Sequence, residues 1–314
     1  MRNFWAVLVL AVVFVPSAAA EDRVDRFVSQ LEAAPGDQQL RVIAALGRSK
    51  SEKAGSALVK IFDIKKGKAR QLTAIAQALG RLKDPSATLP LMTAWDYLNS
   101  MRLRAELPAN IQALRAQIVE SLGQISDERS SPVIVSAIQD EDPRVVQSGV
   151  EAAGRLRLRK TYEMIVELLS REGDVGQAAY EALAEMKDKR ALPALEKGLS
   201  SENPLVSSQA AYALARMDDD RGEETLRKIM LRQSKETPEG ILASYYMVKL
   251  DKTTGLDYLF VVLRSKESRL RPRAAMALGK AGNRKAVPPL IEILEMKEPE
   301  LRLLAARGLG QLGG

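Results

Sequence analysis

Two residue types are missing from this sequence: none of its 314 residues is a histidine or a cysteine. Their absence excludes Ser-His-Asp and Cys-His nucleophile systems, imidazole acid–base catalysis, and metal sites bound by histidine or thiolate. Disulfide bonds are excluded as well. We therefore expect no catalytic, cofactor-binding or metal-binding residues and no cofactor. Carboxylate chemistry is the enzymatic alternative that remains open.

Aromatic residues are scarce, at 4%, although 46% of the residues are hydrophobic. Such a composition favours many thin apolar interfaces, as between stacked helices, over one thick core. We therefore expect an all-α protein built from stacked helices.

Long hydrophobic runs are also absent. The most apolar stretch, Phe4 to Val15, has 12 residues, whereas a helix needs about 20 to span a bilayer. It is followed by Pro16 and the small residues 17–20, a pattern typical of a secretory signal peptide. We expect residues 1–20 to be removed and residues 21–314 to form one domain, without a membrane span, that is periplasmic or secreted. An uncleaved membrane anchor is the alternative.

One segment recurs along the chain in variants of Ala-Leu-Gly-Arg, and it marks an internal repeat. We call the small residue of each copy its anchor. Successive anchors lie 30 to 34 residues apart, except for one interval of 43, and Lys249 fills the matching place in the seventh copy. The anchors are Gly47, Gly80, Gly123, Gly154, Ala184, Ala215, Gly279 and Gly310. The sequence thus predicts nine units.

Prolines supply a second mark at a constant distance. Four of them lie 11 residues before an anchor, where proline favours the first turn of a helix. These are Pro143, Pro204, Pro238 and Pro299. The residues before them, Asp142, Asn203, Thr237 and Glu298, stand where caps or first-turn acids are expected. Each proline therefore predicts the start of the second helix in a pair. Together with the nine units marked by the anchors, this predicts nine helix pairs.

A Leu-Pro-x-Leu-like first helix, an Asp/Asn-Pro-x-Val-like turn and a Val-x-x-x-Ala-x-x-Ala-Leu-Gly second helix resemble the short bacterial form of the HEAT repeat, over about residues 22–314. The phycobilin-lyase-type repeat is similar. The resemblance implies a right-handed α-solenoid of about nine helix pairs. It does not extend to the iron site of the deoxyhypusine hydroxylases, whose His-Glu pairs have no counterpart here. A phycobilin-lyase-like subunit remains an alternative, although a signal peptide conflicts with that role.

Basic residues recur immediately after the anchors, in the last turn of each second helix. They are Arg48, Arg81, Arg155, Arg216 and Lys280. If the helices stack evenly, these residues form an anion-binding ladder; the simpler interpretation is that each cation stabilises a helix C-terminus. Further basic clusters could contact phosphates or an anionic surface. The clusters are Lys65, Lys66, Lys68 and Arg70; Arg155, Arg157, Arg159 and Lys160; and Arg264, Lys266, Arg269, Arg271 and Arg273.

Acidic residues are densest at Asp218, Asp219 and Asp220, followed by Glu223 and Glu224. This run lacks the alternating spacing and the glycine of an EF-hand loop, so we interpret it as a solvated turn.

Apolar side chains gather on the second helices toward the C-terminus, in contrast to Glu120, Glu151 and Glu181 earlier in the chain. The candidate partner-binding residues are Tyr212, Leu242, Tyr246, Met276 and Leu303. The alternative is that the two tyrosines fill the core between repeats. We predict an exported scaffold that binds another protein of unknown identity, without catalysis. A binder of nucleic acid or anionic surfaces through the basic patches is the alternative.

Overall fold

The computed structural model describes residues 18–31, 36–102, 107–231, 236–265 and 269–312. The chain divides into two compact units, one ending at Ser130 and one beginning at Ser131, and each is described by itself. In the described ranges all regular structure is helical, which confirms the all-α prediction. The expected signal peptide falls largely on residues 1–17, outside these ranges, and helix α1 begins at Ala18.

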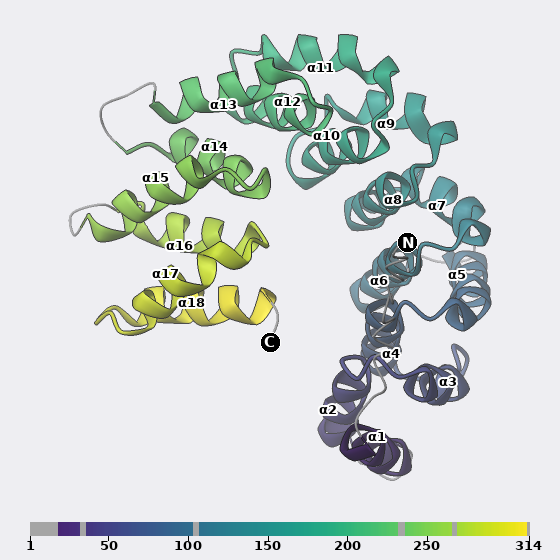
Figure 1. Cartoon of the computed structure of the whole chain (residues 1–314). Coiled ribbons are helices and arrows are strands. Elements are labelled where there is room, and N and C mark those ends of the chain that lie inside the picture. The colour runs from purple at the N-terminus through teal and green to yellow at the C-terminus, as the bar shows by residue number, and fades with distance from the viewer. Residues whose placement is uncertain (1–17, 32–35, 103–106, 232–235, 266–268, 313–314) are drawn as a thin grey trace, which may run out of the picture. The chain divides into compact units, whose positions relative to one another are not determined.

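The described residues of the first unit form six α-helices and two short 3-10 helices (Figure 1). The α-helices are α1 (Ala18–Leu31), α2 (Gly36–Leu46), α3 (Glu52–Ile61), α4 (Ala69–Leu82), α5 (Thr88–Arg102) and α6 (Ala109–Ile125). The 3-10 helices are η1 (Pro85–Ala87) and η2 (Glu128–Ser130). Trp95 of α5 is buried and lies under the guanidinium of Arg115 of α6, 4.8 Å from the ring centroid. This contact joins α5 to α6, the longest helix pair of the unit.

The second unit contains twelve α-helices and three 3-10 helices in its described residues. The α-helices are α7 (Ser131–Ile138), α8 (Pro143–Leu156), α9 (Tyr162–Leu168), α10 (Asp174–Met186), α11 (Leu192–Leu199), α12 (Pro204–Arg216), α13 (Asp220–Leu231), α14 (Pro238–Lys249), α15 (Thr253–Arg264), α16 (Arg271–Lys280), α17 (Val287–Leu294) and α18 (Pro299–Gln311). The 3-10 helices are η3 (Arg159–Thr161), η4 (Lys189–Ala191) and η5 (Arg284–Ala286).

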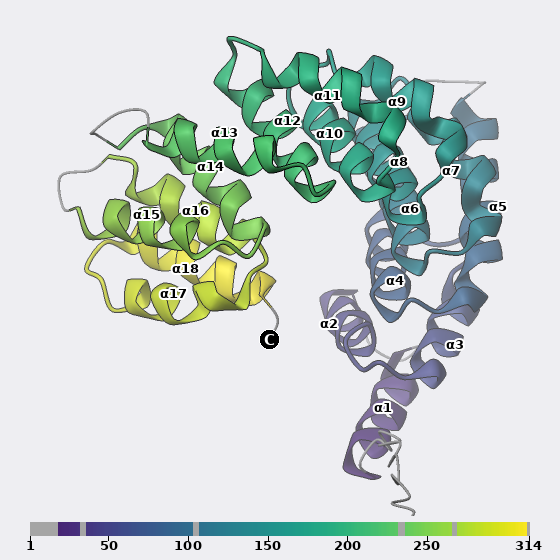
Figure 2. The same ribbon diagram turned by 45° about the horizontal axis from the view of Figure 1, so that its top comes forward.

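Odd- and even-numbered helices form two layers in the second unit (Figure 1, Figure 2). Each even-numbered helix packs against the odd-numbered helix before it and against the adjacent even-numbered helices of the same unit. The resulting stack of helix pairs is the predicted solenoid. The even-numbered helices pack closely on one another, so we call their layer the inner layer. No helix in the described part of the chain has the length and hydropathy required to cross a membrane.

The anchors explain the close packing of the inner layer. A Cβ atom on Gly154 of α8 would lie 2.8 Å from the Cα of Ala182 on α10, and a Cβ on Gly279 of α16 would lie 2.6 Å from the Cα of Gly308 on α18. Side chains larger than hydrogen do not fit at such distances. Gly154 and Gly279 therefore each pack against the residue two positions before the next anchor, an arrangement that Gly47 and Gly80 repeat in the first unit.

The prolines open their helices as predicted. Helices α8, α12, α14 and α18 begin at Pro143, Pro204, Pro238 and Pro299. Three of the four preceding residues act as N-caps with their side chains: Asp142, Asn203 and Thr237 accept a hydrogen bond from a backbone N–H of the first turn. Glu298 forms no such bond. These local signals fix where the inner helices start.

The seventh repeat requires a correction, because Lys249 does not stand at the anchor position. Inner helices end in a residue with positive φ three positions after the anchor, such as Arg157 after Gly154 (φ 51°). In α14 this residue is Asp251, with φ 61°, so the anchor is Val248. The backbone agrees: Lys252 N–H bonds to Met247 O as Leu158 N–H bonds to Ala153 O.

The anchor of this repeat was assigned to Lys249 because Lys249 lies 11 residues after Pro238, as the other anchors do after their prolines. Thr237 caps the N–H three residues ahead, whereas Asp142 and Asn203 cap the N–H two residues ahead. The first turn of α14 is thus built differently, and Pro238 precedes the anchor by one residue less. Lys249 consequently belongs to the basic column after the anchors.

Candidate functional site

The inner helices α8, α10, α12, α14 and α16 present two rows of side chains, three residues before and one residue after their anchors. The two positions are four residues apart, so they lie on the same side of a helix. The first row contains Glu151, Glu181, Tyr212, Tyr245 and Met276, and the second contains Arg155, Glu185, Arg216, Lys249 and Lys280. We call these ten residues the inner-face rows.

At the centre of the rows, Lys249 of α14 reaches across α12 to Glu181 of α10. Its Nζ lies 2.7 Å from Oε2 of Glu181, and the two side chains are 19% and 26% exposed. On the way the ammonium group passes 4.8 Å from the ring centroid of Tyr212. Burial alone would lower the pKa of Lys249, but the carboxylate of Glu181 and the neighbouring tyrosines raise it. Lys249 therefore stays protonated and joins three consecutive inner helices.

Three tyrosines pack around this ion pair. The rings of Tyr212 and Tyr246 stack with centroids 4.9 Å apart, and Tyr245 meets Tyr246 at 5.0 Å. Tyr246 is fully buried, and its hydroxyl forms no hydrogen bond with the described residues. Burial raises the pKa of all three phenols, so they remain neutral near pH 7. The cluster supplies contact area and a fixed cation, not a phenolate nucleophile.

A second carboxylate, Glu185 of α10, lies beside this cluster against the close contact made by Gly154. Burial raises its pKa, while the positive charges of Arg155, Lys249 and Arg216 act in the opposite direction. Arg155 itself pairs with Glu151 on its own helix, at 3.3 Å. In the second row, basic and acidic side chains thus alternate from α8 through α10 to α12, which suits recognition of a polar partner surface.

The candidate partner-binding residues are divided by burial. Tyr246 is 0% and Tyr212 is 6% exposed, so both belong to the core between repeats, and they are not surface contacts. Leu242 is half-buried. Met276 and Leu303 are 41% and 53% exposed, and binding at these two positions stays a prediction. Aromatic side chains fill the α12–α14 interface because Tyr246 occupies the position that Ala182 has on α10.

The five residues of the predicted anion-binding ladder are exposed, each in the last turn of an even-numbered helix or directly after it. Arg48 and Arg81 belong to the first unit, and Arg155, Arg216 and Lys280 to the second. Lys249 also belongs to this column, but the sequence analysis assigned it to the anchor position. The correct register follows from the positive φ of Asp251, which cannot be read from the spacing of small residues in the sequence. Whether these residues bind anions stays a prediction.

Acidic side chains already neutralise part of the other basic clusters. Arg70 pairs with Asp37 at 3.2 Å, and Arg271 pairs with Glu298 at 2.8 Å. Lys266 lies outside the described residues. These ion pairs reduce the charge available to a phosphate backbone.

The acidic turn after α12 is paired in the same way. Asp218 contacts Lys187 at 3.0 Å, and Asp219 accepts hydrogen bonds from Arg221. Within the described ranges no group of acidic side chains is arranged to hold a metal ion.

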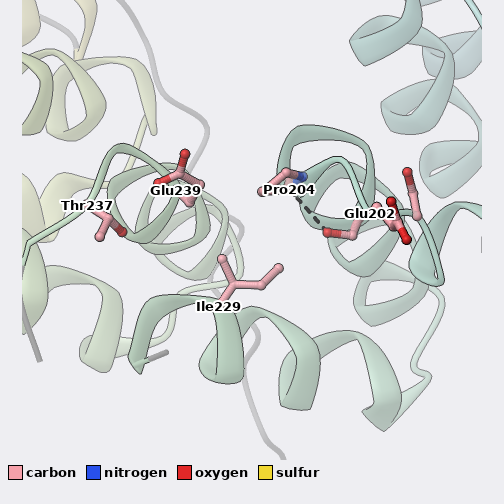
Figure 3. A pocket seen from close by; sticks show the side chains of 7 residues that line it. Glu202, Pro204, Ile229, Thr237 and Glu239 are labelled. Atoms are coloured by element: carbon pink, nitrogen blue, oxygen red, sulfur yellow. Dashed lines mark hydrogen bonds between the residues drawn. The ribbon is translucent and has the colours of Figure 1, made fainter. Parts of the chain in front are cut away.

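A cavity of about 650 Å³ lies among α12, α13 and the start of α14. Figure 3 shows Thr237 and Glu239 on one wall, Pro204 and Glu202 on the opposite wall, and Ile229 between them. Ser201 and Ser207 complete the lining. This cavity brings together two carboxylates and three hydroxyls, and carboxylates are the groups that an enzyme of this composition would use.

The sequence model of HEAT repeats matches residues 100–179, 163–239 and 256–314. The matched segments cover more than half of the chain, which therefore belongs to the HEAT repeat family. No curated protein matches the sequence.

Three solved structures can be superposed on nearly the whole of this chain. The complex of CpcE and CpcF of phycocyanin lyase from Nostoc sp. PCC7120 has a TM-score of 0.44 and 12% identity, with 98% of this chain and 99% of that chain covered. Human deoxyhypusine hydroxylase in complex with glycerol has a TM-score of 0.37 and 18% identity, with 94% and 97% covered. An engineered protein has a TM-score of 0.36 and 20% identity, with 96% and 92% covered.

Proposed function

We propose that the protein is an exported scaffold that binds another protein through the inner layer of its second unit and catalyses no reaction. HEAT repeats generally serve as protein-binding surfaces, because stacked helices present long rows of side chains. The observation that carries the proposal is the inner-face rows, in which exposed Arg216, Met276 and Lys280 flank the fixed Lys249–Glu181 pair.

Three features support binding over catalysis. The lack of histidine and cysteine leaves carboxylates as the acid–base groups available at neutral pH. The phenols of the cluster are held neutral by burial. Glu185, whose pKa is raised by burial, lies near three cations of the rows and does not line the cavity among α12, α13 and α14. Export rests on the N-terminal segment, whose apolar run and small residues are typical of a signal peptide.

Site-specific photo-crosslinking in the native cell tests the binding proposal. A photoreactive amino acid replaces Arg216 or Lys280 on the inner layer, and in a matched control it replaces Lys197, an exposed residue of outer helix α11. We expect a crosslinked protein at the inner positions, identified by mass spectrometry, and little at the control position. Crosslinks confined to Lys197, or none at any position, would contradict the proposal.

A further inference from the structure

The inner layer ends in a patch that combines exposed apolar and basic side chains. Met276 on α16 and Leu303 on α18 are exposed large apolar residues. The same two helices carry Arg273 and Lys280 on α16 and Arg307 on α18, and all three are exposed. We call these five residues the C-terminal patch.

The close approach of two glycines brings the patch together. Because Gly279 and Gly308 let the backbones of α16 and α18 come into contact, the side chains next to them are neighbours on the surface. Lys280 follows Gly279, Met276 precedes it by one turn, and Arg307 precedes Gly308. An apolar centre with a charged rim is the usual arrangement of a protein-binding surface.

The charge of the patch is not balanced locally. Arg273, Lys280 and Arg307 form no ion pair with any residue that the structure describes. In the same repeats, Arg264 and Arg271 pair with Glu292 and Glu298 instead. The patch therefore attracts an anionic group, and the net charge of residues 21–314, 46 − 40 = +6, adds a long-range attraction for an acidic partner.

We infer that the C-terminal patch binds an acidic amphipathic helix of the partner protein, an inference that rests on the proposed function. Helices form all the regular structure of the described chain, so it offers no strand edge to which an extended peptide could add. A helix with an apolar stripe matches Met276 and Leu303, and carboxylates on both sides of the stripe match the three cations. Met276 can adapt to the side chains that it meets, since methionine is flexible.

Fluorescence anisotropy with a labelled synthetic helix tests the inference. The probe is an 18-residue peptide with a leucine stripe at helical spacing and glutamates flanking it; its matched control carries lysines in place of the glutamates. We expect the acidic peptide to bind and the basic one not to. The Lys280→Glu/Arg307→Glu double variant should weaken binding of the acidic peptide by about tenfold or more.

The control variant reverses two exposed cations elsewhere, Lys197→Glu and Arg284→Glu, and should bind within about twofold of the unmodified protein. Leu303→Ser should weaken binding while the melting temperature stays the same. Equal binding of both peptides, or an equal loss in both double variants, would overturn the inference. So would patch-dependent binding to phosphatidylglycerol vesicles without binding of the acidic peptide, because the surface would then recognise a membrane.

The crosslinking experiment separates this inference from the proposed function. If Arg216 crosslinks a partner and the Lys280→Glu/Arg307→Glu variant still captures it equally well, the inner layer binds a protein but the C-terminal patch is not its docking site. If no position captures a protein, the proposed function itself fails.

Discussion

Lys249 and Glu181 lie 68 residues apart in the sequence, yet their side chains form an ion pair that passes over the ring of Tyr212. The pair joins α14 to α10 and skips the helix between them. Repeat proteins are normally held together by contacts between adjacent repeats, so a bond of this range is an addition to the usual pattern.

Removing the ammonium group tests how much the pair contributes. Lys249→Met should lower the free energy of unfolding by about 1–2 kcal/mol, because it leaves a half-buried carboxylate unpaired and removes the contact with Tyr212. Adding Glu181→Gln should restore part of the loss, which urea denaturation would measure. Additive losses in the double variant would show that the two residues are not coupled.

Removing the buried hydroxyl of Tyr246 should stabilise the protein, in contrast to the loss expected for Lys249→Met. Tyr246→Phe removes a buried hydroxyl that has no partner among the described residues, and it should raise the free energy of unfolding by up to about 1 kcal/mol. Tyr162→Phe is the matched control, because the Tyr162 hydroxyl donates to the carbonyl oxygen of Arg190 at 2.7 Å. That substitution should cost about 1 kcal/mol. Equal effects at both positions in chemical denaturation would show that Tyr246 is hydrogen-bonded in solution.

Substitution of glycine by alanine at two anchors, one closely packed and one in open space, tests the packing at the anchors. Gly154→Ala places a methyl group against the backbone of Ala182 and should cost about 1–3 kcal/mol. Gly310→Ala meets open space within 4 Å and should be neutral or stabilise α18 by up to about 1 kcal/mol. Thermal melts of the two variants would measure the difference. A Gly154→Ala protein as stable as the Gly310→Ala protein would disprove the close packing at the anchors.

Acid stability should depend on Asp127 of the first unit. Hydrogen bonds from Arg129 lower the pKa of Asp127 to about 2, and Thr88 Oγ1 donates a further one at 3.0 Å. Because the pKa is lower in the folded state than in the unfolded state, the carboxylate stabilises the fold above about pH 4, and this contribution disappears as the pH falls toward 2. We expect it to be on the order of 1 kcal/mol after solvent screening.

Comparison with Asp127→Asn checks this assignment. The stability difference between the two proteins, measured by urea denaturation from pH 6 to pH 2, should shrink through that window. A difference that is constant with pH would assign the effect to shape and not to charge.

Export is tested by mass. The intact protein recovered from the periplasm or the medium should begin at Glu21, because cleavage is expected after Ala20. A mass that includes residues 1–20 would show that the segment is retained as an anchor. Recovery from the cytoplasm alone would refute export.

Much of the fold could be predicted because its signals are local. Pro143 and its counterparts open helices, and anchors such as Gly154 permit the close packing that makes a solenoid. The assignment at Lys249 was wrong because it relied on the distance from Pro238, and the cap at Thr237 is built differently. The last turn of a helix is the better marker where the first turn varies.

The candidate site was less predictable, because its contacts join residues of different repeats. The sequence spacing placed Tyr246 one residue out of register, in the exposed row, whereas it stands at the buried position that Ala182 has on α10. Tyr212 does stand in that row, but its ring stacks on Tyr246 and is buried there. The ion pair of Lys249 skips a repeat, so comparison of adjacent repeats does not reveal it. The Asp-x-Arg pairs at Asp127, Asp142, Asp188 and Asp219 were detectable in the sequence, since each aspartate pairs with the arginine two residues later.

The bond between α10 and α14 bears on how the second unit opens. In a chain of identical neighbour contacts, one repeat can detach while the others stay folded, and the ends of the array fray first. A link that spans three inner helices makes the loss of any one of them break contacts in the other two. Backbone amides of α10, α12 and α14 should therefore exchange with deuterium together, as one block with a single opening energy, and substitution of Lys249 should divide this block into independently exchanging helices.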